Sequence, residues 1–240
     1  MLDVFDLIIT DKEEVLLNDV FLVDESKAQI ENLLKEHRYI EELSKYKLPV
    51  NNKIILSGAT GCGKTMTAKA IAKALGKNIL ILNLSNIISS RIGESSQHIK
   101  QVFDKAVRER AVLFLDEFDQ IGKARSANEQ DVGEMRRLVN SMIQLMDYFP
   151  EKALLIAATN HVDIIDTALL RRFQLRINFE MPTNIVLDNF YDKILGNYPE
   201  NLRNINRIYG ISFAEAKDYT LTTVKKKLIE ELENKTGLKI

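Results

Sequence analysis

An eight-residue, glycine-rich run constrains the fold of this chain more than any other feature. Its sequence is Gly58-Ala59-Thr60-Gly61-Cys62-Gly63-Lys64-Thr65, which matches G-x-x-x-x-G-K-[ST] at every fixed position. An apolar segment precedes it and an amphipathic segment follows it, as the pattern requires. Glycines let backbone N–H groups approach a polyphosphate closely, and a helix N-terminus adds a favourable dipole. The run predicts a phosphate-binding loop in which Lys64 reaches the β- and γ-phosphates and the Thr65 hydroxyl binds Mg²⁺.

From residue 53 onward, short apolar runs alternate with amphipathic segments. The apolar runs predict strands that are covered on both faces of a sheet. Helices are predicted between them, and repeated strand–helix–strand units imply right-handed crossovers and a mainly parallel sheet. We therefore expect an α/β three-layer sandwich with a five-stranded parallel sheet. The predicted strands are 53–57, 79–84, 111–115, 153–159 and 175–180, and the helices are 64–75 and two others around 99–107 and 132–149.

The two ends of the chain differ from this middle part. The first 52 residues predict a short irregular lead and then a helix that Asp24 caps and that ends before Pro49. Beyond Pro182 the pattern favours helices only, at 185–195, 202–209 and 212–234. The predicted domains are a lead with a linker helix at 1–52, an α/β domain at 53–182 and a small all-helical lid domain at 183–240.

Composition excludes several classes of protein. The 33 Lys and Arg against 34 Asp and Glu give a formal net charge of −1, which argues against a broadly basic nucleic-acid-binding surface. The single cysteine excludes an internal disulfide framework, and the three histidines lack metalloprotease spacing. No segment approaches the roughly 18 apolar residues of a membrane span. The N-terminus is acidic where a signal peptide is basic, so we expect a cytoplasmic protein without a membrane span.

Two carboxylates follow the apolar run 112–115. Asp116 and Glu117 are expected at the carboxyl end of a strand beside the phosphate loop. There Asp116 is predicted to support Mg²⁺, and Glu117 to deprotonate a water molecule that attacks the γ-phosphate. The sequence thus predicts a Mg-dependent ATPase.

From residue 24 to residue 234 the chain resembles the AAA+ ATPases, and within them the AAA clade that remodels proteins. The segment Ala157-Ala158-Thr159-Asn160 is similar to the family's sensor 1, in which the asparagine contacts the γ-phosphate and the attacking water. The stretch 166–173 is similar to the one that supplies arginine fingers, here Arg171 and Arg172, to the ATP site of a neighbouring subunit. The resemblance implies ATP and Mg²⁺ as cofactors and a homo-oligomer, either a hexameric ring or a spiral. It also implies a separate protein as substrate or effector.

Other parts of the resemblance concern the surroundings of the nucleotide. Asn83 matches a polar switch residue that can hydrogen-bond the catalytic glutamate. The segment 210–216 resembles the family's sensor 2 helix without its arginine, which implies that Gly210 and Ala214 lie near the adenine or ribose. Met66, directly after the phosphate loop, is a further candidate for contact with the adenine.

Two loops are expected to face a central channel. In the first, 89–95, Arg91 stands where members that thread polypeptide usually carry an aromatic residue, so threading is an open question and an acidic substrate is the alternative. The second is the polar stretch 123–133.

Other classes of function fit the sequence less well. A nucleic-acid-associated AAA+ ATPase of the helper, loader or initiator type would favour a sensor 2 arginine, a basic groove or an appended DNA-binding domain, and the sequence indicates none of these. A GTPase needs Asn-Lys-x-Asp to recognise guanine, whereas the segment 160–163 lacks the lysine. A small-molecule kinase would not need adjacent arginines and a sensor-2-like helix.

Overall fold

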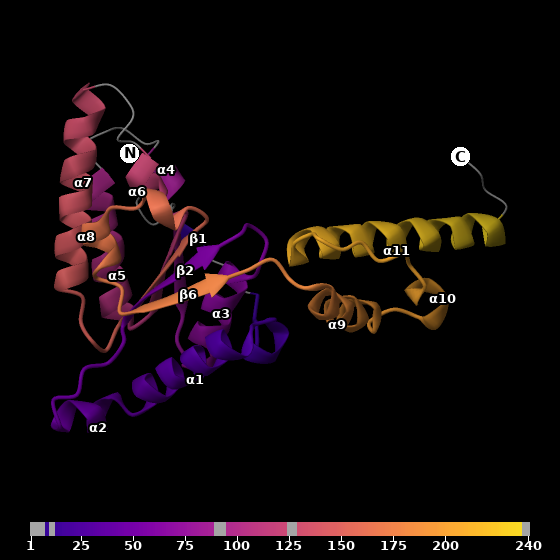
Figure 1. Cartoon of the computed structure of the whole chain (residues 1–240), viewed down its shortest axis with the longest axis horizontal. Helices are drawn as coiled ribbons and strands as arrows, with labels where there is room; N and C mark the ends of the chain where they lie inside the picture. Colours follow the sequence, from indigo (N-terminus) through magenta and orange to yellow (C-terminus); the bar gives the residue numbers. More distant parts are fainter. Residues whose placement is uncertain (1–7, 10–12, 89–94, 124–128, 237–240) are drawn as a thin grey trace. The chain divides into compact units, whose positions relative to one another are not determined.

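The computed structural model describes residues 8–9, 13–88, 95–123 and 129–236 (Figure 1). Contacts within the chain divide it into two compact units. The first comprises residues 1–58 and 64–179, and the second comprises residues 59–63 and 180–240. Five residues of the phosphate loop therefore group with the C-terminal helices. The domain boundaries that the sequence suggests, at 52 and 182, stay predictions.

The first unit contains a six-stranded sheet in the order β1-β3-β4-β5-β2-β6. The pairings between β3, β4, β5, β2 and β6 are parallel, as predicted, whereas β1 pairs with β3 in the antiparallel direction. The five predicted parallel strands are all present, and the antiparallel β1 adds a sixth strand that was not predicted, because its two described residues give no periodic signal. The strands are β1 (Ile8–Ile9), β2 (Lys53–Gly58), β3 (Ile79–Asn83), β4 (Val112–Asp116), β5 (Leu154–Thr159) and β6 (Leu175–Phe179).

Helices cover both faces of this sheet, which explains the near-continuous apolar strands. Figure 1 shows α5 (Ser95–Glu109) and α7 (Glu129–Asp147) on one side, and α1 (Asp24–Arg38) with α3 (Lys64–Ala74) on the other. Alternate residues of the central strands pack against α5 and α7, and every residue of β5 is buried. This burial stabilises the sheet by about 25 cal/mol for each Å² of apolar surface removed from water.

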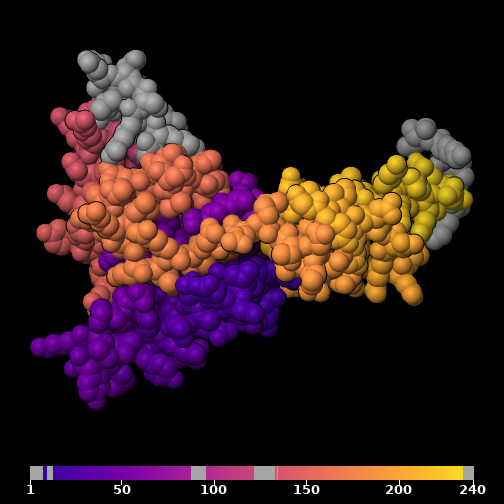
Figure 2. Space-filling view, viewed as in Figure 1, coloured from indigo at the N-terminus to yellow at the C-terminus, as the bar shows by residue number. Residues whose placement is uncertain are grey.

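The N-terminal helices follow a short 3₁₀ turn at Leu17–Asp19. Asp24 is the first residue of α1 rather than its cap, because Val23 takes the extended backbone conformation of the cap position and makes no side-chain hydrogen bond there. A second helix, α2 (Ile40–Lys45), ends four residues before Pro49. In Figure 2 these helices form the indigo and violet part of the surface of the first unit.

The predicted channel loops are described only in part. Arg91 lies outside the described residues, as do 124–128 in the second loop. The two ends of the stretch 123–133 are helical, because α6 (Gln120–Lys123) ends there and α7 begins at Glu129. The remaining short elements of this unit are α4 (Leu84–Ile88), a 3₁₀ turn at Val162–Ile164 and α8 (Thr167–Leu170).

The second unit contains α9 (Asn184–Leu195), α10 (Glu200–Arg203) and α11 (Phe213–Thr236). Its core is formed by Leu187, Tyr191, Leu195, Leu202, Ala216 and Val224. Within the described ranges, no helix is both long and apolar enough to span a membrane.

The helix predicted at 202–209 is wrong for most of its length. The helical turn α10 ends at Arg203, and the following segment lies along α9 instead. There Arg207 Nη1 lies 2.7 Å from Asp188 Oδ1, and the hydroxyl of Tyr191 donates to the carbonyl oxygen of Ile208 at 2.9 Å. The Tyr191 hydroxyl also accepts from the backbone N–H of Ile208 at 3.3 Å, so both backbone polar groups of this residue are satisfied without a helix.

A buried histidine makes the stability of the first unit depend on pH. A ring N–H of His37, at Nε2, donates to the carbonyl oxygen of Asn51 at 2.9 Å, and burial lowers the pKa of this imidazole below 6.5. Below pH 6.5 the unfolded chain therefore takes up a proton that the folded chain does not, so the free energy of unfolding falls as the pH decreases, down to the folded-state pKa. We expect wild type to lose more stability than His37→Gln between pH 7.5 and pH 5, measured by urea unfolding. Parallel stability curves for the two proteins would contradict this assignment.

Candidate functional site

The phosphate loop is a tight turn between β2 and α3. Its glycines Gly58, Gly61 and Gly63 all have positive φ, at 132°, 75° and 101°. At Gly58 there is also no room for a side chain, because an added Cβ would lie 1.9 Å from the carbonyl oxygen of Phe179. Lys64 is 8% exposed, and its ammonium group donates to the carbonyl oxygen of Gly58 at 2.7 Å. The loop thus holds a nearly buried positive charge against its own backbone.

Asp116 lies at the carboxyl end of β4 and belongs to the same cluster. The side chain of Thr65 hydrogen-bonds its carboxylate, and the backbone N–H of Glu117 donates to Oδ1 at 2.9 Å. Partial burial raises the pKa of Asp116, whereas the hydrogen bonds and the charge of Lys64 act in the opposite direction. The structure therefore brings Lys64, Thr65 and Asp116 together, as the sequence predicts.

Glu117 has an unusual backbone conformation for a residue with a side chain, with φ at 53°. Its carboxylate Oε2 accepts a hydrogen bond from the hydroxyl of Ser85. Asn83, the predicted partner, instead accepts from the backbone N–H of Ser85 through Oδ1 at 2.9 Å. Ser85, rather than Asn83, thus contacts Glu117. Asn83 instead stabilises the turn that positions Ser85.

The end of β5 is held by a second polar contact that the sequence did not indicate. The hydroxyl of Thr159 donates to Asp119 Oδ1 at 3.0 Å, and it accepts from the backbone N–H of His161, also at 3.0 Å. Both Asp119 and Thr159 are almost completely buried. Asn160, the predicted sensor residue, lies between the two anchored positions and is exposed. A short backbone segment thus presents Asn160 to solvent.

The two predicted finger arginines have different surroundings. Arg172 makes two hydrogen bonds of 3.1 Å to the carboxylate of Asp147, through Nε and Nη2, and a third of 2.7 Å to the carbonyl oxygen of Ala168. Arg171 directly follows α8 and is exposed. The fixed orientation of Arg172 leaves Arg171 as the guanidinium presented to solvent.

The remaining predicted nucleotide contacts lie in both units. Met66 is half-buried in the first turn of α3. In the second unit Gly210 has a φ of 72°, and the backbone N–H of Ala214 donates to the carbonyl oxygen of Gly61 at 3.2 Å. The contribution of these three residues to nucleotide binding stays a prediction.

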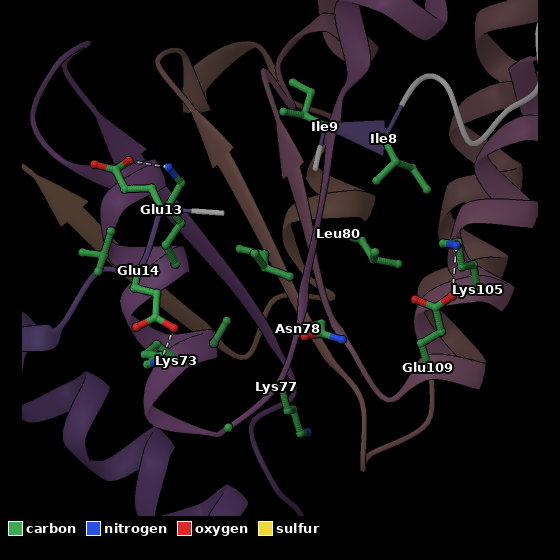
Figure 3. A pocket seen from close by; sticks show the side chains of 15 residues that line it. Ile8, Ile9, Glu13, Glu14, Lys73, Lys77, Asn78, Leu80, Lys105 and Glu109 are labelled. Atoms are coloured by element: carbon green, nitrogen blue, oxygen red, sulfur yellow. Dashed lines mark hydrogen bonds and ion pairs between the residues drawn. The ribbon is translucent and has the colours of Figure 1, made fainter. Parts of the chain in front are cut away.

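A separate cavity of about 890 Å³ opens beside β1 and the start of β3 (Figure 3). Ion pairs line it, among them Lys73 with Glu14 at 2.6 Å and Lys105 with Glu109 at 2.9 Å. None of the predicted site residues lines this cavity. It is therefore not part of the candidate nucleotide site.

Comparison with known families decides the class of this protein. Residues 54–181, more than half of the chain, match the family described as ATPase family associated with various cellular activities (AAA). The chain belongs to the AAA ATPase family. The match covers the phosphate loop, the acidic pair and both arginines, so the resemblance expected from the sequence is confirmed at the level of the family.

Relatives of this AAA ATPase include proteins of different size. An uncharacterized AAA family ATPase, y4kL of Sinorhizobium fredii, is 33% identical over 89% of this chain and 65% of its own length. The ATP-dependent zinc metalloprotease FtsH of Leptotrichia buccalis is 31% identical over 71% of this chain and 23% of its own. Protein SAV of Sulfolobus acidocaldarius is 38% identical over 64% and 20%. The chain thus spans less than two thirds of the length of each of these relatives.

The contact between Ser85 and Glu117 leads to a prediction for the ATPase. Loss of the Ser85 hydroxyl removes a hydrogen bond to the carboxylate of Glu117, the predicted general base. We therefore expect Ser85→Ala to lower kcat about tenfold with little change in KM for ATP. Ser85→Thr keeps a hydroxyl at this position and serves as the matched control. A steady-state phosphate-release assay that gave Ser85→Ala the kcat of wild type would contradict the role given to Ser85.

Proposed function

We propose that this AAA ATPase hydrolyses ATP with Mg²⁺, acts as an oligomer and uses the energy to remodel or regulate a partner protein. The observation that carries the proposal is the cluster of Lys64, Thr65 and Asp116 at the phosphate loop, with Glu117 next in the chain. This cluster combines one nearly buried positive charge with oxygen ligands beside a loop of backbone N–H groups.

The ligands at this cluster fit a magnesium ion. The hydroxyl of Thr65 and the carboxylate of Asp116 are hydrogen-bonded to one another, and oxygen atoms of this kind are the ones that Mg²⁺ prefers. Thr65 and Asp116 would hold the ion, which when bound supplies positive charge that neutralises the β- and γ-phosphates. Binding of the ion would favour the ionised carboxylate of Asp116, whereas the partial burial of this side chain disfavours it.

In the proposed mechanism each group of the chain has one role. Backbone N–H groups of the loop and the Lys64 ammonium bind and orient the phosphates. Glu117 accepts a proton from water as the water oxygen attacks the γ-phosphorus, and the bond from this phosphorus to the β–γ bridging oxygen breaks. Asn160 orients the attacking water. A strained Glu117 backbone and the Ser85 hydroxyl hold the carboxylate in a defined position.

The arginines support action as an oligomer. Arg171 is exposed and Arg172 is fixed by Asp147. We infer that Arg171 is the main finger, which reaches the γ-phosphate bound to a neighbouring subunit and stabilises the charge that develops there. Arg172 would act as a positioning residue that orients the end of α8.

The names of two relatives support a protein as the partner of this chain. One is named an ATP-dependent zinc metalloprotease, and another, from Plasmodium falciparum, is named a putative cell division cycle ATPase. The protease name joins ATP use to action on proteins. We propose that this chain also acts on a protein, and that its substrate or effector is a separate molecule.

Substitutions in the phosphate loop and the acidic pair test the proposed chemistry. We expect Lys64→Ala to abolish ATP binding, because it removes the positive charge that holds the phosphates. Glu117→Gln should still bind ATP but hydrolyse it at least about a hundredfold more slowly, as expected when a general base is lost. Binding of a fluorescent ATP analogue and single-turnover hydrolysis, each with and without Mg²⁺, separate the two effects. Wild-type turnover in Glu117→Gln would show that the catalytic assignment is wrong.

The Glu117→Gln variant also serves to find the partner. A variant that binds ATP without hydrolysing it should keep its protein substrate bound, so this partner should co-purify in the presence of ATP. Lys64→Ala is the matched control, because it should retain neither ATP nor the partner.

The roles of the two arginines are tested by comparison of their variants. Arginine fingers in related systems contribute about 10³–10⁵ in rate, so we expect Arg171→Ala to lower kcat by about 10³ without loss of ATP binding. Arg172→Ala should cost less in rate and should lower the melting temperature as well, because it breaks the contact with Asp147. Arg38→Ala, which removes an exposed arginine at the end of α1, is the control.

Mixing experiments test whether the finger acts between subunits. Lys64→Ala subunits carry an intact Arg171, so adding them to Arg171→Ala subunits should restore part of the turnover. Specific activity should also rise with protein concentration across the assembly range. A strictly linear dependence of total activity, no complementation and a monomer by sedimentation in ATP would together exclude the oligomeric mechanism.

A further inference from the structure

The first turn of α11 is bonded to the phosphate loop. Ser212 caps the helix together with Glu215, whose carboxylate accepts from the backbone N–H and the hydroxyl of Ser212 at 2.8 and 2.7 Å. The backbone N–H of Ala214, which has no acceptor within its own helix at this position, donates to the carbonyl oxygen of Gly61 at 3.2 Å. The phosphate loop thus provides the acceptor that the first turn of α11 lacks for the N–H of Ala214.

Gly61 packs closely against the first turn of α11. A Cβ added at Gly61 would lie 2.6 Å from the hydroxyl of Ser212 and 3.0 Å from the Cβ of Ala214. The glycine at this position is therefore required by contact with α11, in addition to the positive φ of the turn.

A second contact holds the loop to the same part of the chain. The thiol of Cys62 is 1% exposed, and its Sγ lies 3.7 Å from the Sδ of Met181. Residues 59–63 accordingly group with residues 180–240, whereas Lys64 and the rest of α3 group with the sheet. The boundary between the two units crosses the phosphate loop itself.

We propose that the backbone N–H of Ala214 is a positioning group for the phosphate loop. By holding the carbonyl of Gly61 it fixes the loop in the conformation that binds the phosphates, so nucleotide affinity depends on the first turn of α11. This inference rests on the proposed ATP site, but the link between loop and helix can be tested without nucleotide.

Cys62 offers a direct measurement, because it is the only cysteine in the chain and lies in the loop. Ala214→Pro removes the N–H donor at a first-turn position where a helix tolerates proline. We expect this variant to raise the rate of maleimide labelling of Cys62 in the native protein about tenfold, a change of the size that loss of one hydrogen bond can produce. Ala214→Ser keeps the N–H and should label at the wild-type rate.

A second control separates the hydrogen bond from the stability of the helix end. Ser212→Ala weakens the cap of α11 and leaves the N–H of Ala214 in place, so its labelling rate should stay within about twofold of wild type. Equal acceleration in Ser212→Ala and Ala214→Pro, or no acceleration in Ala214→Pro, would overturn the proposal.

Nucleotide binding completes the test. Ala214→Pro should raise the dissociation constant of a fluorescent ATP analogue about three- to tenfold, while Ser212→Ala should bind nearly as tightly as wild type. Faster labelling with unchanged affinity would show that the bond holds the loop without positioning it for phosphate, and would also overturn the proposal. Failure of wild type itself to bind ATP would instead contradict the proposed function, with the labelling rates still deciding the link.

Discussion

The parallel pairing of the central strands is the constraint on which the candidate site depends. Because parallel strands end at the same edge of a sheet, this pairing aligns Asn83 with Asp116 across β3 and β4, and Ser57 with Thr159 across β2 and β5. The phosphate loop begins one residue after Ser57. A shift of one residue in any of these registers would move a functional side chain to the wrong face. The buried apolar runs that fix the register thereby also fix the site.

The charges at this edge of the sheet balance one another only in part. Lys64 is nearly buried and relies on the carbonyl oxygen of Gly58 and on its proximity to Asp116. Burial makes the ionised form of Asp116 less favourable, while the neighbouring groups favour it. Such a cluster resembles other functional sites, in which charges are held at some cost to stability so that a ligand finds them already in place.

The sequence predicted what is periodic or fixed by a motif. The five parallel strands, their covering helices and the cluster around Lys64 follow from apolar runs and from one loop pattern. It did not predict β1, of which two residues are described, or the non-helical path of 204–209, which depends on contacts with Asp188 and Tyr191 of α9. Tertiary contacts of this kind override local helix propensity and leave no periodic signal.

The same reason explains which functional contacts were missed. Ser85, Asp119 and Asp147 act through partners that are far away in the sequence, at Glu117, Thr159 and Arg172. No spacing rule links such pairs, so only the fold reveals them. The sequence placed two arginines together without distinguishing them, whereas the carboxylate of Asp147 does so.

The pairing of Arg172 with Asp147 has a consequence for assembly. Arg172 is already paired, whereas the exposed guanidinium of Arg171 would lose its hydration when subunits of the proposed oligomer meet. Desolvation of an unmatched guanidinium is unfavourable, and only an anion on the opposite face compensates for it. The γ-phosphate of a bound nucleotide is such an anion. The nucleotide would then stabilise the contact between subunits. The contact of Arg171 with the γ-phosphate would promote hydrolysis, and hydrolysis would in turn weaken that contact.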